Sequence, residues 1–116
     1  MKTVLKLEEL AMLVGCVILL ASFHVSWWMY LVLFLGPDIS MLGYLINNKA
    51  GAWCYNLFHH KGIAVALIAA GYTMDNWLLI AGIVLFGHAS MDRVAGYGLK
   101  YENGFKFTHL GEIGKK

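Results

Sequence analysis

Charged residues are scarce through most of this chain. Of its 116 residues, only 14% are charged and 59% are hydrophobic, and the mean hydropathy is +0.64. The stretch from Leu10 to Met91 contains only four charged side chains: Asp38, Lys49, Lys61 and Asp75. Soluble globular domains carry more charge than this. The composition therefore predicts an integral membrane protein, and the net charge of +2 is too small to indicate nucleic-acid binding.

Cysteine is equally scarce, and the common catalytic loops are missing. The two cysteines, Cys16 and Cys54, lie in apolar stretches, which excludes a disulfide-stapled secreted scaffold. The sequence has no Walker loop, no Rossmann glycine pattern and no Gly-x-Ser-x-Gly elbow. These absences exclude the nucleotide-binding and serine-hydrolase classes that depend on such motifs.

What remains is a series of apolar runs separated by short polar breaks. The pattern predicts one all-α domain over residues 1–116 with four transmembrane helices. We expect these helices over 7–23, 27–35, 52–70 and 77–93, with residues 1–98 in the membrane and 99–116 as a polar cytoplasmic tail. Gly36 and Pro37 should end or kink the second helix, and irregular or half-helical structure should follow over 39–48. Asp75 or Asn76 should cap the fourth helix.

The distribution of basic residues predicts the orientation. With four crossings and a cytoplasmic amino terminus, all nine lysines and arginines fall on the cytoplasmic side. The outer loops then keep only His24 and Asp75 among titratable side chains. The positive-inside rule therefore places both termini in the cytoplasm and the protein in the plasma membrane as a multi-pass protein.

Ionisable residues at membrane depth point to a site. His88 and Asp92 are four residues apart, so they share one face of a helix, and such groups in an apolar segment usually face a partner, a cavity or an ion. The expected topology brings further residues to the same cytoplasmic level. They are Glu8 on the first helix, Asp38 at the end of the second, and His59 and His60 near the start of the third.

Imidazoles and carboxylates that converge inside a helical bundle are the ligands of Zn, Mn or Fe. The sequence therefore predicts a divalent metal site, with Zn favoured. The predicted ligands are Glu8, Asp38, His59, His60, His88 and Asp92. Because neighbours on a helix are about 100° apart, only one of His59 and His60 can face inward.

A catalytic role is predicted for three residues near that site. The metal would lower the pKa of a bound water, and whichever carboxylate is not a ligand would act as base. Asp92 is a candidate for both roles, ligand and catalytic residue. Arg93 would hold an anionic group, and Asn56 would orient a ligand or the substrate.

Two other interpretations use the same residues. His88 and Asp92 can simply hydrogen-bond each other while Arg93 extends to lipid phosphates, in a structural or regulatory protein without catalysis. The same acids and histidines can also form a proton or ion pathway in a small transporter or channel subunit. A homodimer that completes the site is a further expectation, since Gly15, Gly71 and Gly82 permit close helix approach.

Several short blocks carry a resemblance to a known family. They are Leu7-Glu8, the run from Pro37 to Tyr44, Gly51-Ala52 with Tyr55-Asn56 and His59, His88 with Asp92-Arg93, the run from Gly96 to Tyr101, and Thr108 to Gly111. With these blocks the chain resembles a bacterial family of small four-helix integral membrane proteins described as a domain of unknown function. The resemblance covers nearly the whole chain and implies a bacterial inner-membrane protein.

A second resemblance concerns activity. Pro37-Asp38, His59-His60 and His88 to Asp92 follow the order seen in the inner-membrane metal-dependent hydrolases that the DNA-damage repressor controls. The chain departs from that pattern at Ser40, where those hydrolases have a second acid. This resemblance implies a metal-activated water that attacks a phosphoester or another lipid-borne group, so the expected partners are the bilayer and an anionic, lipid-like small molecule.

Overall fold

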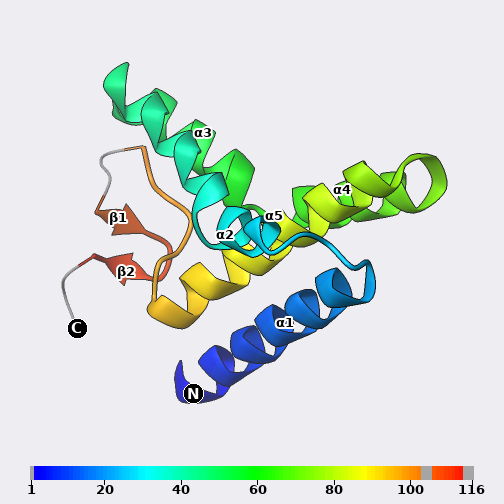
Figure 1. Cartoon of the computed structure of the whole chain (residues 1–116). Helices are drawn as coiled ribbons and strands as arrows, with labels where there is room; N and C mark the ends of the chain where they lie inside the picture. Colours follow the sequence, from blue (N-terminus) through cyan, green and yellow to red (C-terminus); the bar gives the residue numbers. More distant parts are fainter. Residues whose placement is uncertain (1, 103–105, 114–116) are drawn as a thin grey trace.

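The computed structural model describes residues 2–102 and 106–113. Within these ranges the chain is almost entirely helical, as the sequence predicts, with one short hairpin near its end (Figure 1). The elements, in chain order, are α1 (Lys2–Ser22), α2 (Trp28–Leu35), the 3-10 helix η1 (Gly36–Leu45), α3 (Asn48–His59), α4 (Lys61–Met74), α5 (Asn76–Ala95), β1 (Phe107–Thr108) and β2 (Gly111–Glu112).

Helix α5 is the centre of the fold, since α1, α2, α3 and α4 all contact it. Its buried apolar residues Ile80, Ile83 and Val84 form one core with residues of α1 and α2. The fully buried members from those two helices are Leu20 and Leu33. Burying an aliphatic side chain of this size stabilises a structure by about 1.5–3 kcal/mol in water, so this core fixes α1 and α2 against α5.

Two glycines allow α4 and α5 to pack closely. A Cβ atom on Gly71 would lie 2.1 Å from the backbone nitrogen of Leu79, and one on Gly82 would lie 2.7 Å from Cγ1 of Ile68. Small residues let helix backbones approach in this way. Gly71 and Gly82 therefore serve a contact within the chain, whereas a Cβ on Gly15 would meet no neighbouring atom.

The second helix ends where proline predicts. Gly36 and Pro37 open the 3-10 helix η1, in which Asp38 lies in the first turn. Proline has no backbone N–H, so an α-helix cannot continue through it with all its hydrogen bonds. The expected irregular or half-helical segment is confirmed as this 3-10 helix, which places Asp38 beside α5.

The prediction of one helix over 52–70 is wrong, because the chain breaks at His60. His60 has extended backbone angles (φ −88°, ψ 116°), and its imidazole accepts a hydrogen bond from the backbone N–H of Ile63. It is therefore the N-cap of α4, and α3 ends one residue earlier. The helix before it also starts earlier than predicted, since the side chain of Asn47 caps α3 by accepting from the N–H of Ala50 at 2.7 Å.

The segment predicted as a polar tail folds back onto α3. Gly96 adopts a left-handed conformation (φ 91°) and caps α5, so the chain reverses there. The backbone of Lys100 then pairs with the amide of Asn56, and Trp53 donates a hydrogen bond to Glu102. Lys100 and Thr108 are buried as a result.

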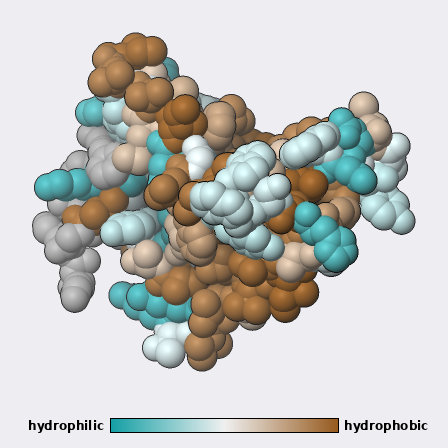
Figure 2. Space-filling view, viewed as in Figure 1, coloured by the Kyte–Doolittle hydropathy of each residue, from teal (hydrophilic) through white to brown (hydrophobic). Residues whose placement is uncertain are grey.

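Among the described residues, two helical stretches are long and apolar enough to cross a membrane. They are Trp28–Leu45, which combines α2 and η1, and Asn76–Ala95, which is α5. Many large apolar side chains elsewhere are exposed, including Ile18 on α1 and Val65 on α4. Figure 2 shows a broad apolar area on this face of the molecule, including the region over α1.

The cap of the last helix is also as predicted. Asp75 has extended backbone angles and precedes α5, and its carboxylate accepts a hydrogen bond from the N–H of Trp77 at 3.0 Å. An aspartate at this position satisfies a backbone donor that the first turn of the helix leaves unpaired. The α4–α5 turn is therefore defined by Asp75.

Candidate metal centre

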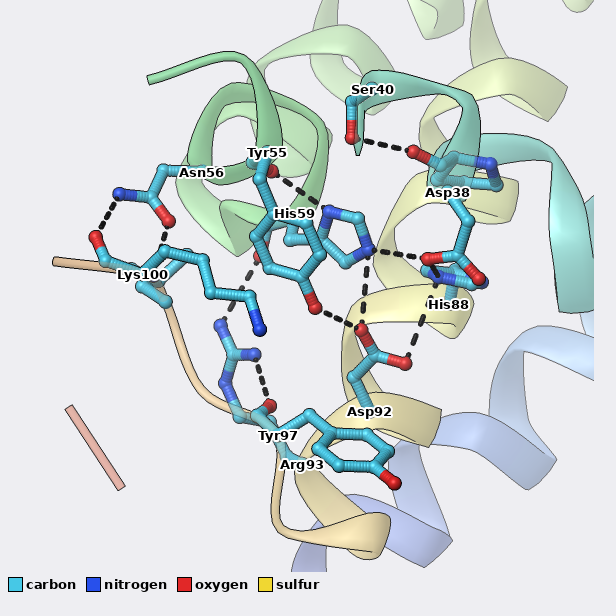
Figure 3. Close-up of polar contacts among 12 residues, drawn as sticks. Asp38, Ser40, Tyr55, Asn56, His59, His88, Asp92, Arg93, Tyr97 and Lys100 are labelled. Carbon is cyan, nitrogen blue, oxygen red and sulfur yellow. Dashed lines mark hydrogen bonds and ion pairs between the residues drawn. The ribbon is translucent and has the colours of Figure 1, made fainter. Parts of the chain in front are cut away.

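Four titratable side chains from η1, α3 and α5 meet at one point (Figure 3). Asp38 comes from η1, His59 from the last residue of α3, and His88 and Asp92 from successive turns of α5. Each offers one ligand atom, and these four atoms all lie within 4.8 Å of one another. We call this set the His/Asp cluster.

Each imidazole of the cluster faces both carboxylates through its Nε2 atom. Nε2 of His59 lies 3.3 Å from Oδ1 of Asp38 and 3.2 Å from Oδ2 of Asp92. Nε2 of His88 lies 3.0 Å from the same Asp38 oxygen and 3.7 Å from Oδ1 of Asp92. The two nitrogens and the carboxylate oxygens therefore surround a common point.

The other nitrogen of each ring is held by the backbone. Nδ1 of His88 donates to the carbonyl of Leu33 at 2.7 Å, and Nδ1 of His59 donates to the carbonyl of Tyr55 at 2.8 Å. In an α-helix the carbonyl of Leu33 would accept from residue 37, but Pro37 has no N–H. The proline that ends α2 thus leaves an acceptor for His88.

For a neutral ring, these bonds define the tautomer. With the proton on Nδ1, the lone pair of a neutral imidazole is on Nε2, which points at carboxylate oxygens. Two lone pairs facing two carboxylates repel unless protons or a cation lie between them. A ring that donates its remote N–H to a backbone carbonyl is the usual arrangement of a metal-binding histidine.

Asp92 has an additional partner. The hydroxyl of Tyr55 donates to its Oδ2 at 2.7 Å, and the ring of Tyr55 stacks on His59 with centroids 3.8 Å apart. Tyr55 therefore orients both a carboxylate and an imidazole. The sequence gave this tyrosine no functional role, and it appeared only among the blocks that resemble the family.

Burial of the cluster is uneven. Both histidine side chains are 0% exposed and that of Asp92 is 9% exposed, whereas the side chain of Asp38 is 40% exposed. Buried charges need a partner or a metal, because desolvation is costly. The cluster can therefore be reached from the surface of the molecule at Asp38.

The donor set fits a divalent transition metal. Tetrahedral ligands at about 2.0–2.1 Å from Zn are about 3.3 Å apart. The nitrogen–oxygen distances in the cluster are 3.0, 3.2, 3.3 and 3.7 Å, near that spacing, and the four ligand atoms taken one per residue lie within 4.8 Å of one another. Two imidazoles and two carboxylates also balance a divalent charge, and they suit Zn, Mn or Fe.

Two predicted ligands lie elsewhere. Glu8 is exposed on α1 and lies outside the cluster, while its neighbour Glu9 forms an ion pair with Lys61 that ties α1 to α4. His60 is exposed and caps α4. Of the adjacent histidines, His59 is thus the one that faces inward. Four of the six predicted ligands come together.

Arg93 and Asn56 have structural partners beside the cluster. Arg93 donates to the backbone carbonyls of His59 at 3.2 Å and Tyr97 at 3.0 Å, so it links the end of α3 to the turn after α5. Asn56 pairs with both backbone groups of Lys100. Their amide and guanidinium groups hold the C-terminal segment against α3.

Lys100, like Tyr55, lies near the site although the sequence gave it no functional role. Its Nζ lies 4.6 Å from the ring centroid of Tyr55, and its residue is only 4% exposed. Burial lowers the pKa of its amine to about 8, although the carboxylates of Asp92 and Asp38 oppose this shift. Only its basic character was visible in the sequence, because its burial depends on the turn at Gly96.

The fold and the cluster define a class of protein, a small helical bundle with a buried histidine–aspartate centre and two helical stretches able to cross a membrane. The chain belongs to the family DUF4260, a domain of unknown function, whose model matches residues 2–113. No curated protein and no solved structure matches it.

Proposed function

We propose that this protein is a multi-pass membrane protein whose His/Asp cluster binds a divalent metal, with Zn favoured, and hydrolyses a phosphoester or related lipid-borne group. The observation that carries the proposal is the orientation of the two imidazoles. His59 and His88 both present Nε2 to Asp38 and Asp92 while their Nδ1 atoms are held by carbonyls. A cation held by these four residues would relieve the repulsion between neutral rings and carboxylates.

The residues divide into metal ligands and groups that would act on the water or the substrate. A bound metal would supply Lewis acidity and an activated water. His59, His88 and Asp92 are buried and oriented by Leu33 and Tyr55, which suits ligands.

In a catalytic site with three protein ligands, Asp38 would be the carboxylate that is not a ligand. It contacts both imidazoles and is partly exposed, so it is the one best placed to accept a proton from water. The ammonium of Lys100 lies over the ring of Tyr55. It adds positive potential near the cluster, which favours an anionic substrate. Arg93 contributes to that potential while it holds the carbonyls of His59 and Tyr97.

In the membrane, α1, α2 with η1, α4 and α5 would form four crossings, with both termini in the cytoplasm. The arrangement of the helices supports this. The α1–α2 connection and the α4–α5 turn lie at one end of the molecule, and the amino terminus and the end of α5 lie at the other (Figure 1). The cluster then lies toward the cytoplasmic end in the plasma membrane.

The surroundings of the cluster favour an enzyme over an ion conduit. The apolar core that includes Leu20, Leu33 and Ile83 packs between α1, α2 and α5, on the side of His88 that leads toward the α4–α5 turn. A transport pathway would need polar groups there. The partly exposed Asp38 gives access to the cluster from the surface of the molecule.

Metal content of the purified protein tests the proposal. Elemental analysis of the detergent-solubilised chain should find about one zinc per chain, and His88→Ala and Asp92→Asn should reduce it to background. Glu8→Gln and His60→Ala are matched controls that remove the same kinds of group outside the cluster, so both should keep the metal. Release of phosphate from a long-chain alkyl phosphate should stop with a chelator and return with zinc.

If the cluster is only a structural network of hydrogen bonds and ion pairs, the metal content should be zero. If wild-type protein binds no metal and nitrogen NMR shows His59 and His88 both cationic at neutral pH, the cluster is a structural network of two imidazoliums and two carboxylates. Equal metal content in all four variants would also contradict the proposal.

A further inference from the structure

An apolar groove of about 410 Å³ runs between α2 and α5. Six of the residues that line it are Trp28, Pro37, Phe58, Trp77, Ala81 and Val84, and none of its lining residues is charged. Binding sites for small molecules have volumes of about 300–1,000 Å³ and mostly apolar walls. We call this feature the α2–α5 groove.

The groove ends beside the His/Asp cluster. Pro37 directly precedes Asp38, Phe58 directly precedes His59, and Val84 lies one helical turn before His88. Two of the four cluster residues are thus adjacent in the chain to the groove's lining, and a third, His88, lies one helical turn from it. Asp38, the partly exposed member of the cluster, follows Pro37 at this end of the groove.

The length of the groove suits a hydrocarbon chain. On α5 its lining extends from Trp77 to Leu85, which advances about 12 Å along the helix axis at ~1.5 Å per residue. One leaflet of a bilayer is about 15 Å thick in its hydrocarbon part. Trp28 and Trp77 lie at the end remote from Pro37, so the groove leads from the cluster through the apolar layer toward the end of the molecule that carries the α4–α5 turn.

We propose that the α2–α5 groove binds the acyl chain of a membrane amphiphile whose phosphoester headgroup reaches the His/Asp cluster. This inference rests on the proposed function and names its substrate class. The groove carries no charge to hold a headgroup, whereas the cluster and the buried ammonium of Lys100 provide polar and cationic groups. Chain and headgroup are therefore recognised by different residues.

Calorimetric titration of the full chain in nanodiscs can separate the two parts. The probes are dodecyl phosphate and inorganic phosphate. Ala81→Phe would fill the groove, and Ala69→Phe, at an exposed position of α4, is the matched control. We expect Ala81→Phe to weaken dodecyl phosphate binding by about tenfold, through lost burial of the chain, and to leave inorganic phosphate binding unchanged. Ala69→Phe should alter neither.

Two results would overturn the inference: dodecyl phosphate that binds no more tightly than inorganic phosphate, or an equal effect of the two phenylalanine variants. Zinc analysis of the same samples keeps the metal proposal separate. If no zinc is found and Ala81→Phe still weakens binding of the dodecyl probe, the metal assignment is wrong and the groove remains a chain-binding site.

Discussion

Nδ1 of His88 lies 2.7 Å from the backbone carbonyl oxygen of Leu33. The oxygen is available because the residue four positions later is Pro37, which cannot donate a helical hydrogen bond. A helix-ending proline thereby determines which nitrogen of His88 faces Asp38. The local chemistry of α2 and the chemistry of the cluster are linked through this single bond.

Pro37→Ala should weaken metal binding without unfolding the protein. Alanine supplies the missing N–H, so the Leu33 carbonyl can be satisfied within α2 and His88 loses its fixed orientation. Loss of such an outer partner usually lowers metal affinity by about 10–100-fold. Competition with a chelating dye would measure the dissociation constant, and Ile39→Ala, at an exposed position of η1, is the control. An unchanged constant would show that the carbonyl does not orient the ring.

Tyr55→Phe tests the second orienting contact. The change removes only the hydroxyl that donates to Asp92 at 2.7 Å and keeps the ring that stacks on His59. We expect zinc affinity to fall by about 10–100-fold. Tyr72→Phe is the matched control, since Tyr72 is 83% exposed. Equal affinities for the two variants would mean that Asp92 needs no help from Tyr55.

The sequence was sufficient to predict the parts of this fold that depend on local chemistry. Pro37 ends α2, Asp75 caps α5, and the four-residue spacing brings His88 and Asp92 together. The convergence of Asp38 and His59 on this pair followed from counting crossings. These inferences used only helix geometry and the expected topology.

The parts that depend on tertiary contacts could not be read from the pattern. The apolar periodicity continues through His60, and only its role as an N-cap reveals the break between α3 and α4. Residues 99–102 look polar and solvated, yet the left-handed turn at Gly96 returns Lys100 to Asn56. A polar sequence does not exclude burial when backbone groups find partners of this kind.

Lys100 predicts a pH-dependent stability. Burial lowers the pKa of its amine to about 8 from an ordinary value of 10.5. Between these values the unfolded chain binds more protons than the folded one, so the contribution of Lys100 to the unfolding free energy should rise with pH. In chelator-treated protein, the melting temperature of wild type relative to Lys100→Met should therefore increase from pH 8 to pH 10.

The exposed Lys106 provides the control for this experiment, because Lys106→Met should give no such pH-dependent difference. The sign is the decisive part of the result. If the melting temperature of wild type relative to Lys100→Met falls from pH 8 to pH 10, the nearby carboxylates stabilise the Lys100 ammonium more than burial disfavours it.

Accessibility to a membrane-impermeant thiol reagent tests the proposed topology. The natural cysteines, Cys16 and Cys54, are first replaced by alanine, because Cys54 is exposed. In that background Asp75→Cys should be labelled on intact cells, since the α4–α5 turn is placed outside, and Lys106→Cys should react only after the cells are opened. Both positions are exposed in the structure, so burial does not determine the difference. The opposite pattern would put the nine basic residues on the outer side and direct Asp38 away from the cytoplasm, and a cytoplasm-facing site would then be excluded.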